Sequence, residues 1–171
     1  SEFELLSLQN TSFREDNFLH IERTPYQSVD TLSTDVTRAL FTWWSSFHDR
    51  KPSRSDLDIV SLPHLAPYIY LIEVNSPSTF TYRLCGEEVS KLTGRPYRMV
   101  EMSPTCDVLE DRLLSDYLIT LLDLKGPCRC RGSLRQSDTG TTLIFESTDL
   151  PLYDQDGNIT HFVGVMCEMK R

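Results

Sequence analysis

Apolar positions in the stretch from residue 28 to residue 51 recur at steps of three and four. They are Val29, Leu32, Val36, Leu40, Trp43 and Phe47. This spacing places the six side chains on one face of a helix, so it predicts an amphipathic helix over 28–51. Ser28 or Asp30 is suited to cap its start, and Pro52 marks its end.

The remaining pattern alternates between strands and helices. Runs rich in β-branched and aromatic residues predict strands over 68–75, 79–85, 128–136, 141–152 and 159–169. Helical spacing occurs at 86–93 and 105–124, between the second and third of these strands. Together these elements predict an α+β fold, with a five-stranded antiparallel sheet, helices inserted after its second strand, and the amphipathic helix in front.

Residues 1–27 lack a sustained period. They mix polar residues with isolated aromatics and contain one brief extended candidate at 18–21, so we expect an N-terminal leader there. Ser1–Phe3 has the character of a cloning remnant. We expect residues 28–171 to form a single domain that includes the helix over 28–51.

Alternation along the strands predicts which side chains are buried. Tyr82 points inward with its strand neighbours, as do Cys128, Cys130 and Phe145, whereas Arg129, Arg131 and Arg135 face water. On this register Ile69 and Leu71 lie on the opposite face of the sheet and require a cover. The amphipathic helix either folds back onto its own sheet or pairs with a second copy of the chain.

Two adjacent tryptophans complicate the helix. Neighbouring helical residues point about 100° apart, so Trp43 and Trp44 cannot share a narrow stripe. They indicate either a wide buried face or an anchor in an interface, where tryptophan is enriched. The candidate interface residues are Leu40, Trp43, Trp44, Phe47, Ile69 and Leu71.

Composition and charge narrow the classes of partner. The formal net charge is −8, and no dense run of Lys and Arg is present, which argues against a nucleic-acid partner. The longest apolar stretch, 65–74, is interrupted by Pro67 and is too short to cross a membrane. Five cysteines without framework spacing are typical of reduced thiols, so we expect a cytoplasmic protein without disulfides.

Candidate chemical motifs have simpler structural explanations. Cys106 lacks the flanking residues of a flavin photosensor, and all four histidines lie outside the long helix where a haem ligand is expected. Cys128 and Cys130 are more typical of core thiols than of a metal site. Residues 154–158 resemble a hairpin turn rather than a calcium loop. We expect no catalytic residue and no metal, and the sequence leaves the cofactor unknown, with haem and flavin disfavoured.

Several short stretches carry a resemblance to a known family. They are Arg50-Lys-Pro52, Asp56-Leu-Asp58, Tyr82-Arg-Leu-Cys-Gly86, Leu92-Thr-Gly-Arg95 and Leu150-Pro-Leu152. In this order they resemble a PAS-like family of alphaproteobacteria, found as stand-alone proteins, over about residues 36–169. The resemblance implies a five-stranded sheet with helices on one face, used to bind a small ligand, a cofactor or another protein in bacterial signal transduction.

We therefore expect a non-catalytic sensory module that binds a small ligand or a signalling protein and relays its state through the N-terminal helix. The candidate pocket residues are Tyr82, Tyr117, Cys128, Cys130 and Phe145. Output passes to another protein or to a further domain, and a homodimer is a candidate arrangement. The alternatives are a ligand-free interaction or dimerisation module and a small α+β enzyme.

Overall fold

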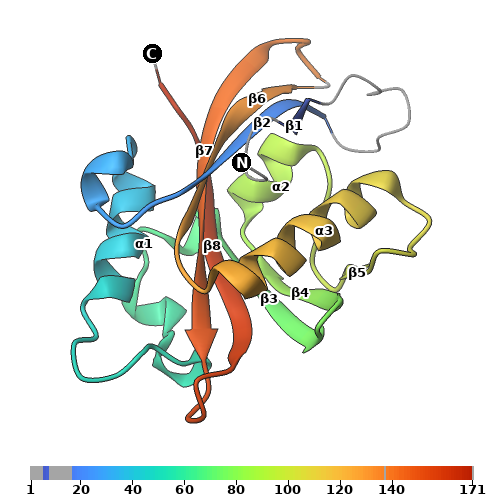
Figure 1. Ribbon diagram of the computed structural model, residues 1–171. Helices are drawn as coiled ribbons and strands as arrows, with labels where there is room; N and C mark the ends of the chain where they lie inside the picture. The colour runs from blue at the N-terminus through green and yellow to red at the C-terminus, as the bar shows by residue number, and fades with distance from the viewer. Residues whose placement is uncertain (1–5, 8–16, 137, 171) are drawn as a thin grey trace.

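One curved antiparallel sheet organises the chain, and helices cover both of its faces (Figure 1). The computed structural model describes residues 6–7, 17–136 and 138–170. Within these residues the sheet has eight strands in the order β1-β2-β6-β7-β8-β3-β4-β5. The strands are β1 (Leu6–Ser7), β2 (Phe18–Pro25), β3 (Ile69–Ser76), β4 (Thr79–Cys85), β5 (Glu101–Met102), β6 (Cys128–Arg135), β7 (Thr142–Tyr153) and β8 (Ile159–Glu168).

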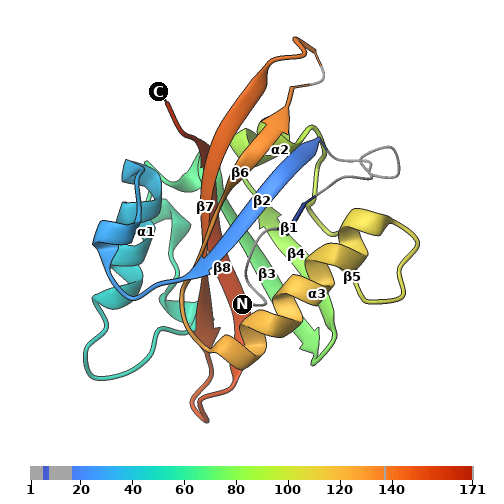
Figure 2. The same cartoon turned by 45° about the horizontal axis from the view of Figure 1, so that its top comes forward.

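Three α-helices accompany the sheet in the described residues. They are α1 (Asp35–Ser45), α2 (Glu87–Thr93) and α3 (Leu109–Leu124), with short 3-10 turns at Val29–Thr31, Arg54–Asp56, Ile59–Ser61 and Ala66–Tyr68. Helix α1 lies on one face of the sheet, and α2 and α3 lie on the other (Figures 1 and 2). None of the described helices is both long and apolar enough to cross a membrane.

Two apolar cores follow from this arrangement. Alternating side chains of β3 separate into them: Tyr70 and Ile72 pack with α2 and α3, whereas Ile69 and Leu71 pack with α1. The predicted outward direction of Ile69 and Leu71 is therefore confirmed. Their cover is the chain's own α1, so the first of the two arrangements expected for the amphipathic helix is the one observed.

The five predicted strands are present as β3, β4, β6, β7 and β8, but the predicted number is wrong because β1, β2 and β5 join the same sheet. Strand β2 lies in the region expected to be a leader and pairs with β6 from Phe18 to Pro25. Its alternation is hidden in the sequence because the inward position after Ile21 is occupied by a charged residue, Arg23, which is 9% exposed.

The helix expected over 28–51 is also shorter than predicted. A 3-10 turn capped by Ser28 supplies Val29, and the α-helix itself begins only after Thr34, whose hydroxyl accepts a hydrogen bond from the Thr37 amide. The helix ends at Ser45. The apolar repeat therefore continues across two elements, because both pack against the same face of the sheet.

Turn chemistry agrees with the predicted hairpin between β7 and β8. Asp154 accepts hydrogen bonds from the amides of Asp156 and Asn158, and Gly157 adopts a positive φ of 83°. Gly94 likewise ends α2 in the left-handed region with a φ of 73°. These predicted ends are confirmed.

Candidate functional site: a buried cavity and the helix contact behind it

A cavity of about 90 Å³ lies between the sheet and helices α2 and α3. Apolar and aromatic side chains make most of its wall, including Phe18 and Ile21 of β2 and Leu114 of α3. Among the described residues, the polar side chains in the wall, apart from tyrosines and a cysteine, are Arg23, Thr93, Glu110, Ser147 and Asp149. Apolar pockets with a few placed polar groups are the usual form of a small-molecule site.

Four of the five residues expected to line a pocket stand around this cavity. They are Tyr82, Tyr117, Cys130 and Phe145. Cys128 is fully buried in the same core but is not part of the cavity wall. Hydrogen bonding with Cys130 and burial raise the pKa of the Cys128 thiol, so this group remains protonated.

Asp149 is the central polar group of the cavity and was not anticipated from the sequence. The Tyr70 hydroxyl donates a 2.5 Å hydrogen bond to its Oδ1, and the Tyr117 hydroxyl donates a 2.5 Å hydrogen bond to its Oδ2. Burial raises the pKa of Asp149, and these two hydrogen bonds offset part of the rise. The available signal was an acid directly before the apolar run Leu150-Pro-Leu152 of the same strand, because acids are rarely buried without partners.

Arg23 supplies the opposite charge from the strand that was expected to be a leader. Its guanidinium carbon lies 3.8 Å from the centre of the Tyr117 ring, a cation–π contact. Its Nε is buried and has no hydrogen-bond partner within the described part of the chain. Buried donors in native proteins are usually paired, so this one requires an explanation.

An ion-pair cluster holds the start of α3 at the cavity rim. Arg95 donates to Glu110 at 3.0 Å and to the two carboxylate oxygens of Asp111 at 2.9 and 3.0 Å. Both carboxylates are nearly fully buried. This cluster fixes the loop after α2 against α3, because a bidentate arginine contact is strongly directional.

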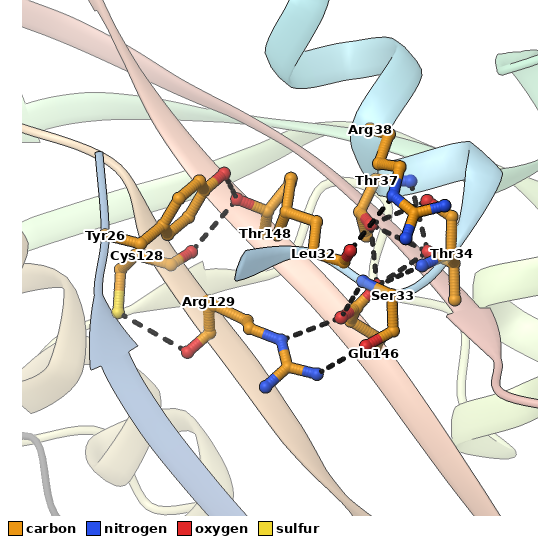
Figure 3. Close-up of polar contacts among 10 residues, drawn as sticks. All are labelled: Tyr26, Leu32, Ser33, Thr34, Thr37, Arg38, Cys128, Arg129, Glu146 and Thr148. Carbon is orange, nitrogen blue, oxygen red and sulfur yellow. Dashed lines mark hydrogen bonds and ion pairs between the residues drawn. The ribbon is translucent and has the colours of Figure 1, made fainter. Parts of the chain in front are cut away.

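A second buried acid, Glu146, faces the opposite side of the sheet and holds the start of α1 (Figure 3). Its Oε2 lies 2.9 Å from the Ser33 amide and 2.7 Å from Arg129 Nε. Its Oε1 lies 2.9 Å from the Thr34 amide, 2.7 Å from the Thr34 hydroxyl and 2.6 Å from the Thr37 hydroxyl. Glu146 thus supplies acceptors for the otherwise free amides in front of a helix.

The ion pair of Glu146 with Arg129 corrects one prediction from strand alternation, that Arg129 faces water. Burial raises the pKa of its carboxyl, but the hydrogen bonds from Thr37, Thr34, Ser33 and Arg129 outweigh burial and hold the pKa below its usual range. Arg129 is therefore not a solvated side chain, because it turns toward this carboxylate under α1. Arg131 and Arg135 are exposed as predicted.

The six candidate interface residues divide into two groups. Leu40, Ile69 and Leu71 are 0, 3 and 1% exposed inside the chain, so they offer no surface to a partner in this arrangement. The other three, Trp43, Trp44 and Phe47, are half-buried. Trp44 Nε1 donates to the Pro151 carbonyl at 2.8 Å, and the rings of Trp43 and Phe47 meet edge to face at 5.4 Å.

No metal-binding group of three or more His, Cys, Asp or Glu side chains occurs among the described residues. His161, considered as a ligand contact or pH-sensitive group, lies on β8 with its Nε2 3.7 Å from Glu73 and its Nδ1 2.8 Å from the Thr160 hydroxyl. It is not part of the cavity wall.

Solved structures that match the chain include several LOV proteins. The dark structure of the blue-light photoreceptor Aureochrome1 LOV is 17% identical over 73% of this chain and 88% of that one, with a TM-score of 0.46. The Rhodobacter sphaeroides LOV protein is 11% identical over 67% of this chain and 70% of that one, with a TM-score of 0.43. An RNA-binding Light-Oxygen-Voltage receptor is 13% identical at a TM-score of 0.45; 86% of this chain is covered, but only 38% of the receptor.

No curated protein matches the chain. A family model described as a PAS domain matches residues 32–167, which is most of the chain. The match includes α1, both cavity helices, and Asp149 and Glu146 of β7. The chain belongs to the PAS domain family.

Proposed function

We propose that this chain is a non-catalytic sensory module of bacterial signal transduction, which binds a small ligand in the cavity and relays the bound state through α1. The observation that carries the proposal is the double role of β7. Ser147 and Asp149 form part of the cavity wall, while Glu146 contacts α1 and Thr148 contacts Tyr26 in the segment that leads into α1.

The relay would act through hydrogen bonds rather than through a hinge. A ligand that favours one position of Asp149 also favours one position of the neighbouring Thr148, which is bonded to Tyr26 at 2.5 Å. The contacts of Glu146 with the start of α1 are short and directional, so a small displacement of β7 weakens them. Ligand binding would then change the population of the docked helix, and a partner protein or a further domain would detect the change.

The volume of the cavity limits the ligand. Drug-sized ligands occupy pockets of about 300–1,000 Å³, whereas this cavity measures about 90 Å³. A flavin or a haem exceeds this volume, so we propose a ligand of only a few non-hydrogen atoms. Cys106, the cysteine compared with those of flavin photosensors, lies outside the cavity wall.

Native mass spectrometry of gently purified protein, followed by denaturing mass analysis of the same sample, tests the proposal. A bound molecule released on denaturation is the expected result. Hydrogen exchange of the α1 amides, measured with and without that molecule, tests the relay, and a changed exchange rate at the start of α1 is expected. Unchanged α1 exchange on ligand binding would refute the relay through this helix.

A cavity-filling pair of variants supplies the control. Ser147→Leu places a larger side chain in the cavity wall and should abolish binding. Ser133→Leu is the same chemical change outside that wall and should leave binding intact. Equal binding by both variants would place the ligand elsewhere.

A ligand-free interaction module is a second candidate, and the half-buried pair Trp43 and Phe47 on α1 favours it. Aromatic residues of this kind are enriched at interfaces. Analytical ultracentrifugation of the wild type and Trp43→Ala separates the two functions. A ligand-free dimer that Trp43→Ala dissociates would support the interaction module over the sensor.

A further inference from the structure

The hydrogen-bonding capacity of the cavity is unbalanced. Asp149 accepts hydrogen bonds from Tyr70 and Tyr117, and the Thr93 hydroxyl donates to the Val89 carbonyl at 2.8 Å. Arg23, in contrast, retains a buried Nε without a partner among the described residues. The cavity therefore contains a buried donor that still requires an acceptor.

The position of Arg23 shows that this donor belongs to the cavity. Arg23 lies on β2 opposite Cys130 of β6, and both side chains are part of the cavity wall. The guanidinium carbon lies 3.8 Å from the centre of the Tyr117 ring, and this cation–π contact holds the group at the wall. A cation that is 9% exposed and held in a preformed cavity is suited to an anionic group of a ligand.

The other charged groups restrict the type of anion. Asp149 and Glu110 are also in the wall, and they repel a ligand of high negative charge. A carboxylate carries a single charge, and its planar shape matches the donor edge of a guanidinium. Phosphate is less suited, because the described residues of the wall offer no additional cation for its second charge.

The size and apolar wall restrict the remainder of the ligand. A cavity of about 150 Å³ holds one benzene molecule of six carbon atoms, so 90 Å³ corresponds to about four non-hydrogen atoms. Ile21, Leu114 and Phe145 offer only apolar contacts to the part of the ligand that does not reach Arg23.

We propose that the cavity binds a short-chain monocarboxylate, of the size of acetate or propanoate, whose carboxylate accepts hydrogen bonds from Arg23 and whose alkyl end lies against the apolar wall. This inference rests on the proposed function, because it names the ligand class of the same site. It assigns the recognition of charge to β2, the strand that pairs with β6 beside the cavity.

Matched ligands test the class directly. Propanoate and propanamide have the same shape and size, but only propanoate is charged at neutral pH. Titration of each into the ¹⁵N-labelled wild-type protein, followed by NMR in a buffer without carboxylates, should show propanoate binding at least tenfold more tightly and shifting amides of β2 and β7. Equal affinities would overturn the carboxylate assignment and leave the cavity as a ligand site.

Matched variants test the residue. Arg23→Met should lower propanoate affinity at least tenfold, and Arg23→Lys, which keeps the charge, should lower it less. Arg131→Gln removes an exposed arginine of the adjacent strand β6 and should not change affinity. If Arg23→Met does not fold, two comparisons still test the proposal: the propanoate affinity of Arg23→Lys against that of the wild type, and the wild-type affinity for propanoate against that for propanamide. If neither ligand binds and native mass analysis releases no other molecule, the proposed function itself fails.

Discussion

Replacing Glu146 by Gln tests the contact between the sheet and α1 most directly. The substitution preserves shape but removes the charge and exchanges one acceptor oxygen for an NH2 donor. The donors around Glu146 come from the backbone amides of Ser33 and Thr34, from the hydroxyls of Thr34 and Thr37, and from Arg129. The NH2 group of Gln would face some of these donors whichever way the amide is turned.

The expected magnitude follows from the groups left unpaired. If the amide oxygen faces Thr34 and Thr37, its nitrogen faces the Ser33 amide and Arg129 Nε. A buried donor without an acceptor costs about 1–3 kcal/mol. Arg129 is 18% exposed and reaches water in part, which reduces its share. We therefore expect Glu146→Gln to lower the free energy of unfolding by about 3 kcal/mol, a large part of the 5–15 kcal/mol typical of a domain.

Urea denaturation followed by circular dichroism measures this change, with Glu168→Gln as the control. Glu168 is exposed on the neighbouring strand β8, so its substitution should alter the free energy of unfolding by less than about 0.5 kcal/mol. A double-mutant cycle with Arg129→Gln should give a coupling energy of about 1–3 kcal/mol. A Glu146→Gln protein as stable as the Glu168→Gln control would refute the assigned role of this carboxylate.

Three further predictions concern pH and packing. The hydrogen bonds of Glu146 lower its pKa below the usual 4.5, so the ionised carboxylate stabilises the fold above pH 4.5, and this stabilisation is lost as the pH falls through the lowered pKa. Urea denaturation at decreasing pH should therefore show a decreasing difference in the free energy of unfolding between wild type and Glu146→Gln. For Asp149 the pH dependence of stability has the opposite direction, because its pKa is raised above the usual 3.8. The free energy of unfolding of the wild type relative to Asp149→Asn should fall as the pH rises from 3.8 through the raised pKa. A parallel pH dependence of both proteins would contradict this. Gly132→Ala would place a Cβ 1.9 Å from the His20 carbonyl oxygen, so it should destabilise the β2–β6 pairing by about 1–3 kcal/mol in urea denaturation; an unchanged midpoint would argue against this packing of β2.

Local patterns predicted the centre of the fold because each element carries its own signal. Asp154 and Gly157 mark a turn by their side-chain and backbone chemistry, and the strand Thr79–Cys85 has the predicted bounds. Strand β2 lacked such a signal, because Arg23 occupies an inward position that strand alternation normally gives to an apolar residue.

The polar contacts of the site depend on pairings distant in sequence. Glu146 meets Thr34 across 112 positions, and Asp149 meets Tyr70 across 79. No periodicity within one element specifies which hydroxyl reaches which carboxylate. Alternation predicted inward directions for Tyr82, Cys130 and Phe145, but the buried charges that distinguish a ligand site from a filled core become visible only when β2 and β7 are placed in one sheet.

The two ends of the sheet affect how the molecule meets other proteins. In the described residues, β1 at one end and β5 at the other are two-residue strands. Long open edges invite a foreign strand to pair with them, and very short edge strands discourage this. β5 covers Phe80 and Thr81 of β4 with its backbone. Self-association through backbone pairing is therefore disfavoured where β5 covers β4.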